Sequence, residues 1–131
     1  MNKVTFRQKL KAHLFTLGRP FAIPFFGSAI LLGAVLAGGL CANAWIALIA
    51  GLLVMFGGHA FNSFLDWKSG LDKGETEDRS AEKDYTGGQN LIEQGIVSAR
   101  ETAINGMVCY VLSAIPISFL ILRVGWQVVI L

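Results

Sequence analysis

Charged residues divide this chain into long apolar stretches and one polar segment. Lys, Arg, Asp and Glu are absent from positions 20–65 and again from positions 102–122. A helix needs about 20 apolar residues to cross the hydrocarbon core of a bilayer, which is about 30 Å thick. The first stretch is therefore long enough for two spans and the second for one. We predict an all-α fold, a polytopic membrane helical bundle with three transmembrane helices.

Glycine and capping signals set the approximate bounds of these helices. Gly38 and Gly39 interrupt the first stretch, and Asn43 after them is a residue type that favours helix N-caps. Ser98 and Glu101 have the capping-box spacing, which indicates the start of the last helix. The predicted helices cover about 21–38, 44–66 and 99–122, with the loop 67–98 between the second and the third. Within this loop, apolar residues near 91–97 predict a short amphipathic helix that covers the end of the second span.

Composition supports a membrane protein over a soluble domain. Hydrophobic residues make up 53% of the chain and charged residues only 15%, against about 25% charged in a typical soluble domain. The high hydrophobicity excludes an intrinsically disordered chain. Two cysteines are too few for a disulfide scaffold, and a net charge of +2 gives no reason to expect a nucleic-acid partner. We expect an integral protein of the cell inner or plasma membrane.

The distribution of basic residues predicts the orientation. Five basic residues precede the first predicted span and five more lie in positions 66–101, whereas the turn between the first two spans has none. Segments rich in Lys and Arg stay on the cytoplasmic side of a membrane. The N-terminus and the 67–98 loop are therefore expected in the cytoplasm, and the turn at 39–43 on the opposite side.

Candidate chemistry lies at the polar end of the second predicted span. Asn62 and Asp66 are four residues apart and share one helix face, and His59 precedes Asp66 by seven on the same stripe. Polar groups within a membrane helix usually face a bundle interior or a water-filled cavity. Gly70 is expected to end the helix and to let the chain turn back, which would bring Asp72 toward Asp66.

The residues at this end match the ligand preferences of magnesium. Carboxylate and amide oxygens are hard ligands, and Mg²⁺ is typically held by one or two carboxylates together with substrate phosphates and water. Basic side chains in the following loop can neutralise the remaining charge of a diphosphate. They include Lys68, Lys73 and Arg79. Spacing alone leaves a second interpretation open, in which Asp66 and Asp72 are simply the solvated end of a helix and a charged loop.

Three separated motifs resemble one known family. They are Asn62-x-x-x-Asp66-x-x-x-Gly70-x-Asp72, the stretch from Thr86-Gly87-Gly88 to Ser98, and Leu17-Gly18-Arg19-Pro20. In this order and at these places on the membrane pattern they resemble the UbiA superfamily of intramembrane prenyltransferases. The six-residue step between the aspartates is closer to the menaquinone-type branch, the dihydroxynaphthoate polyprenyltransferases. Ser63 departs from the family pattern, which usually has Asp or Gln there, but it is expected to point away from the metal-facing stripe.

This resemblance implies an enzyme that transfers a polyprenyl group from polyprenyl diphosphate to an aromatic quinone precursor or a lipid acceptor. It implies that Asp66 and Asp72 bind Mg²⁺ and that Asn62 orients the metal–diphosphate complex. Further contacts to the diphosphate are expected from Arg19, Lys68, Lys73 and Arg79. Family members have about nine transmembrane helices and a second Asp-rich motif. Residues 1–131 are therefore expected to form the N-terminal portion of one such domain, with a turn and the first residues of a fourth helix at 124–131.

Two other functions remain open at this stage. The chain can instead be a non-catalytic membrane partner, or a half-enzyme that requires a second subunit. It can also be a small cation-handling membrane protein that uses Asp66 and Asp72.

Overall fold

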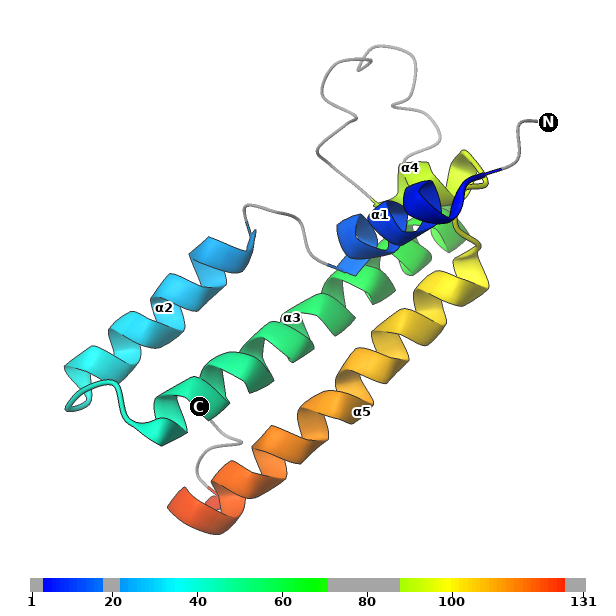
Figure 1. Ribbon diagram of the computed structural model, residues 1–131. Helices are drawn as coiled ribbons and strands as arrows, with labels where there is room; N and C mark the ends of the chain where they lie inside the picture. Colours follow the sequence, from blue (N-terminus) through cyan, green and yellow to red (C-terminus); the bar gives the residue numbers. More distant parts are fainter. Residues whose placement is uncertain (1–3, 18–21, 71–87, 127–131) are drawn as a thin grey trace.

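The structure, a computed structural model, describes residues 4–17, 22–70 and 88–126. About 85% of these residues are helical and none of them forms a strand, which confirms the all-α class. Figure 1 shows the arrangement of the helices. They are α1 (Phe6–Leu17), α2 (Ala22–Leu36), α3 (Ala42–Ser69), α4 (Gly88–Glu93) and α5 (Ala99–Val124).

The helices α3 and α5 lie side by side and antiparallel along most of their length (Figure 1). With a rise of 1.5 Å per residue, they are about 42 and 39 Å long. Both are long and apolar enough to cross a membrane. The sequence prediction of two membrane-length helices here is confirmed, and the observed bounds differ from the predicted ones by at most three residues at any end.

The helix α2 is shorter than its predicted counterpart over 21–38. It covers the 15 residues Ala22–Leu36 and packs against α3. Gly38 and Gly39 follow it in the turn with φ angles of 118° and 122°, a region that L side chains rarely adopt. Because about 20 residues are needed to span a bilayer, α2 by its described length is not a full span. The third transmembrane helix therefore stays a prediction.

The turn between α2 and α3 corrects one sequence prediction. Cys41, and not Asn43, occupies the N-cap position of α3, with extended backbone angles and no side-chain capping bond. Asn43 lies inside the first turn, where its Oδ1 accepts a hydrogen bond of 3.4 Å from Arg123 Nη1 at the end of α5. This contact across two helices uses the amide that the sequence pattern assigned to the cap.

Small residues line the contact between α3 and α5. A Cβ atom added to Gly106 would lie 2.6 Å from Phe61 Cδ2 and 3.2 Å from the Gly57 carbonyl oxygen. The side chains of Ala60 and Thr102 are fully buried here. Small residues let helix backbones approach closely, which is the usual basis of helix association in membranes. The polar end of α3 is thereby fixed beside the first turns of α5.

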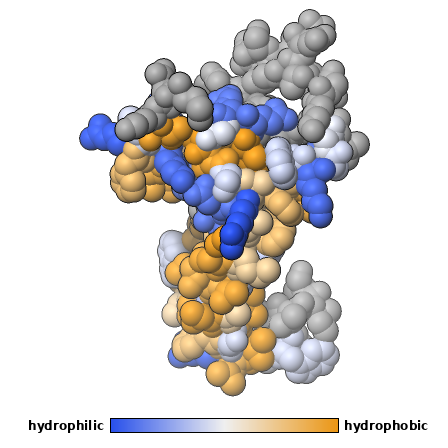
Figure 2. Space-filling view, turned by 90° about the vertical axis from the view of Figure 1, so that its right-hand side faces the viewer, coloured by the Kyte–Doolittle hydropathy of each residue, from blue (hydrophilic) through white to orange (hydrophobic). Residues whose placement is uncertain are grey.

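The short helices α1 and α4 gather at one end of this pair (Figure 1). Ala12 of α1 packs with Ile92 and Val97 in a small buried cluster. The helix α4 also contacts α3, so a short helix is present beside its end as predicted, but it covers Gly88–Glu93 and the predicted positions 94–97 are not helical. Hydrophilic residues collect at the same end in Figure 2, above a column of apolar residues. The helix α1 was not predicted from the sequence.

Candidate functional site

The predicted pairing of Asn62 with Asp66 is present near the C-terminal end of α3. Asn62 Nδ2 donates a 2.6 Å hydrogen bond to Asp66 Oδ2. Asn62 is exposed and Asp66 is half-buried. His59 lies one turn before Asn62 on the same helix and is also half-buried. The three polar side chains therefore share the continuous stripe that their spacing predicts.

Asp66 lies in the last turn of α3, where its backbone carbonyl takes part in ending the helix. Gly70 adopts the left-handed conformation with φ 64°, and its N–H donates to the Asp66 carbonyl oxygen at 3.1 Å. Ser69 Oγ donates to the same carbonyl oxygen at 3.1 Å. These bonds satisfy a carbonyl that would otherwise lack a partner in the helix. The prediction that Gly70 ends the helix is confirmed.

Two neighbours of the stripe point elsewhere. Ser63 is buried, and its hydroxyl donates to the His59 carbonyl oxygen at 3.0 Å, so it lies off the Asn62–Asp66 face as expected. Lys68 is exposed and lies two positions beyond Asp66 in the same helix. Two residues at 100° each turn it about 200° around the axis, to the opposite side of α3. Its positive charge interacts favourably with the C-terminal end of the helix dipole. Its contact with a diphosphate stays a prediction.

The structure describes only part of the predicted magnesium site. Four predicted residues lie outside the described ranges, and these are Arg19, Asp72, Lys73 and Arg79. Within the described ranges, no three His, Cys, Asp or Glu side chains come together as a metal-binding group. One carboxylate and one amide nevertheless fit the chemistry of Mg²⁺, because this ion takes oxygen ligands and commonly completes its shell with phosphate oxygens and water.

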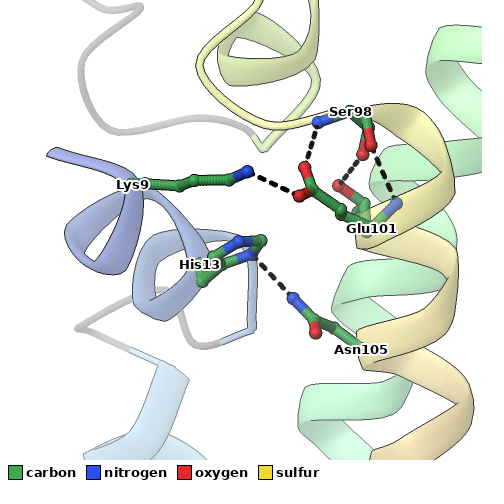
Figure 3. A network of polar contacts seen from close by, with 6 residues as sticks. Lys9, His13, Ser98, Glu101 and Asn105 are labelled. Carbon is green, nitrogen blue, oxygen red and sulfur yellow. Dashed lines mark hydrogen bonds and ion pairs between the residues drawn. The ribbon is translucent and has the colours of Figure 1, made fainter. Parts of the chain in front are cut away.

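A second polar network joins α1 to the start of α5 (Figure 3). Lys9 Nζ lies 2.6 Å from Glu101 Oε1, while Glu101 Oε2 accepts a 2.9 Å bond from the Ser98 backbone N–H. Ser98 Oγ in turn accepts from the Glu101 N–H at 3.1 Å, which confirms the predicted capping box. One turn further along α5, Asn105 Nδ2 lies 2.8 Å from His13 Nδ1.

The helix α1 was missed in the sequence although two local signals were present. Thr5 and Gln8 have capping-box spacing, and in the structure the Thr5 N–H donates to Gln8 Oε1 at 2.9 Å while the Gln8 N–H donates to Thr5 Oγ1 at 3.3 Å. Phe6, Leu10 and Leu14 are spaced by four, which is a helical period.

Neither a protein-family model, nor a curated protein, nor a solved structure gives a significant match to this chain. The likeness to UbiA prenyltransferases is therefore carried by the motifs quoted from the sequence. Of these motifs, the structure describes Asn62, Asp66 and Gly70 of the first, positions 88–98 of the second, and Leu17 of the third.

Proposed function

We propose that this chain forms part of a Mg²⁺-dependent intramembrane prenyltransferase of the UbiA type. The observation that supports the proposal most is the hydrogen-bonded Asn62–Asp66 pair at the polar end of a membrane-length helix, directly before the left-handed Gly70. A polyprenyl diphosphate has an apolar tail and a charged head. A carboxylate at the border between an apolar helix and a polar segment suits the binding of such a molecule.

The two residues of this pair have different proposed roles, with Asp66 as a metal ligand and Asn62 as the residue that orients it. The Asn62 amide holds one oxygen of the Asp66 carboxylate and so fixes the orientation of the group. When bound, Mg²⁺ supplies charge neutralisation and Lewis acidity at the diphosphate leaving group. Asp72 is proposed as the second carboxylate from the sequence motif. Arg19 and the loop bases are proposed to contact the remaining phosphate oxygens, because cationic donors form strong hydrogen bonds to phosphate.

The apolar helices are proposed to bind the prenyl tail of the substrate. In the proposed placement α3 and α5 cross the bilayer, and the end with α1 and α4 faces the cytoplasm according to the distribution of basic residues. Apolar surfaces of these helices accommodate the prenyl tail and keep water from the reacting carbon. The acceptor is an aromatic quinone precursor or a lipid, by the resemblance of the motif.

The alternative of a half-enzyme or a non-catalytic membrane partner is compatible with one further structural feature. Only 28% of the most apolar part of α3 and 17% of that of α5 is buried. Such open apolar surface is available to further membrane helices, from this chain or from a second subunit, as well as to lipid. The two functions differ in whether the chain itself recognises a prenyl diphosphate.

Binding of a polyprenyl diphosphate to the full chain in lipid nanodiscs tests the proposal. We expect binding that requires Mg²⁺ and that weakens about tenfold or more in Asp66→Asn, because the variant removes a charged oxygen ligand of the metal, and loss of a residue that merely orients such ligands already costs about 10–100-fold in metal affinity. Asn has nearly the same shape as Asp but carries no charge. Glu93→Gln is the matched control, because it removes an exposed carboxylate from α4 at the same end of the molecule.

Three results would contradict the proposal, each in favour of a different account. Undiminished binding in Asp66→Asn would show that this residue is not a ligand of the metal. Mg²⁺ binding that is unaffected by prenyl diphosphate would favour the cation-handling protein. Failure of the chain to bind prenyl diphosphate at all would favour the non-catalytic partner.

A further inference from the structure

The helix α1 presents an apolar face that the proposed magnesium site does not use. Its other sides are packed, because Ala12 on the side opposite this face is buried against α4, and His13 on one flank of it contacts Asn105 of α5. Three large apolar side chains spaced by four residues remain exposed on α1. They are Phe6, Leu10 and Leu14, with exposed fractions of 81%, 49% and 60%. Because the packed side fixes the rotation of the helix, these side chains form one outward stripe.

Basic side chains border this stripe. Arg7 and Lys11 are exposed and follow Phe6 and Leu10 by one position, which places them on the flank of the stripe away from His13. The helix contains no acidic residue. A face with apolar side chains in the middle and cations along one border is the composition of helices that lie in a membrane interface.

The contacts of α1 place it at the border between the polar and apolar parts of α5. Lys9 pairs with Glu101, which is the last charged residue before the uncharged run 102–122. His13 contacts Asn105, which already belongs to that run. The helix therefore lies beside the first turns of α5, at the level expected for lipid headgroups if α5 crosses the bilayer.

We propose that α1 is a membrane-surface helix that binds anionic lipid. Phe6, Leu10 and Leu14 enter the boundary between headgroups and acyl chains, and Arg7 and Lys11 contact the phosphates of anionic headgroups. Each basic residue near an anionic surface contributes about 1 kcal/mol, which corresponds to about fivefold in affinity. This inference rests on the membrane placement proposed above and is independent of prenyl transfer.

Spin labels on the full chain, reconstituted in vesicles that contain phosphatidylglycerol, test the position of α1. In a Cys41→Ser, Cys109→Ala background, single cysteines replace Leu10, Gln94 and Val111. Gln94 is an exposed residue after α4 and is the reference for water, whereas Val111 is exposed on the middle of α5 and is the reference for the bilayer interior. Collision rates with oxygen report lipid, and those with a water-soluble nickel complex report solvent.

We expect the Leu10 label to collide with oxygen several-fold more, relative to nickel, than the Gln94 label, and less than the Val111 label. A Leu10 label that matches the Gln94 label would overturn the inference, because the stripe would face water. Shielding of Leu10 from both reagents would also overturn it, in favour of a protein surface on the stripe. If the Val111 label behaved like the Gln94 label, α5 would not cross the bilayer and the membrane placement would be wrong. The diphosphate-binding assay tests the proposed function separately.

The role of the basic flank is tested by lipid selectivity. The preference of the reconstituted chain for spin-labelled phosphatidylglycerol over phosphatidylcholine should fall severalfold in the double variant Arg7→Gln, Lys11→Gln. The exchange variant Arg7→Lys, Lys11→Arg keeps the charge and is the matched control, with a preference close to that of the unmodified chain. Equal preference in all three chains would show that α1 does not bind anionic headgroups.

Discussion

Gly106 is a single position where the helix pair depends on the absence of a side chain. A Cβ atom there would lie 2.6 Å from the ring of Phe61 and 3.2 Å from the carbonyl oxygen of Gly57. The ring can move by rotation, but the carbonyl belongs to the backbone of α3. An added methyl group must therefore shift the ring and press on the backbone of the facing helix.

We predict that Gly106→Ala destabilises the helix pair by about 1–3 kcal/mol, the usual cost of overpacking. The measurement is loss of helical circular dichroism on titration with a denaturing detergent. Gly33→Ala is the matched control, because a Cβ there meets nothing within 4 Å. Ala is favoured over Gly inside a helix by up to about 1 kcal/mol, so this variant should be neutral or more stable. Equal stability of Gly106→Ala and the unmodified chain would contradict the close contact.

Single residues also show where sequence reasoning failed. Asn43 was expected to cap α3, but it contacts Arg123 of α5 and Cys41 takes the cap position. Capping preference is a local effect of about 1 kcal/mol, and a local pattern contains no information on a contact with a residue 80 positions away. By contrast, Ser98 and Glu101 cap α5 as predicted, because both partners of that motif are local.

At the scale of helices, the long apolar elements were predictable and the short amphipathic one was not. The helices α3 and α5 follow from uncharged runs that are each long enough to fill the thickness of a bilayer. The signals for α1 are weaker, since its apolar residues cover only one stripe and five basic residues surround them in positions 1–19. Its position depends on contacts with α4 and α5 that a linear pattern does not contain.

The part of the candidate site that lies within α3 was predictable from the sequence, and the part in the following loop was not. Asn62 and Asp66 lie within one continuous helix, so their four-residue spacing alone predicts a shared face, and the structure shows the bond. The predicted approach of Asp72 depends on the chain after Gly70, which lies outside the described residues together with Lys73 and Arg79. Periodicity predicts which residues are neighbours along a helix, but it carries no information on the path of the loop that follows the helix.

At the scale of the whole molecule, the accessibility of the two cysteines tests the proposed orientation in the membrane. Cys41 is exposed beside the turn at the opposite end from α1 and α4, whereas Cys109 is buried between α3 and α5. We predict that a membrane-impermeant maleimide labels Cys41 from outside intact cells and leaves Cys109 unlabelled until the protein is denatured. Labelling of Cys41 only after the membrane is permeabilised would reverse the orientation.

The pH dependence of this labelling gives a further check. The nearby backbone amides of Ala44 and Asn43, in the first turn of α3, lower the pKa of the Cys41 thiol. The thiolate is the reactive form, so the labelling rate rises with pH as the thiol ionises. This rise should occur at lower pH than for an ordinary exposed cysteine. A rate profile like that of a free thiol would mean that the first turn of α3 does not hold Cys41 in this position.

Asp66 at the polar end of α3 is proposed to hold Mg²⁺ together with a prenyl diphosphate. The most direct measurement replaces Mg²⁺ by paramagnetic Mn²⁺ and records the broadening of a nitroxide attached to the full chain. A label at Ser69→Cys lies within one helical turn of Asp66, whereas a label at Cys41 lies about 38 Å away along α3. Each label is placed in a chain that lacks the other reactive cysteines.

We predict that Mn²⁺ with prenyl diphosphate broadens the spectrum at Ser69 and leaves that at Cys41 unchanged, and that Asp66→Asn abolishes the broadening. Broadening at Ser69 that persists in Asp66→Asn, or equal effects at both labels, would contradict a metal site at this end of α3.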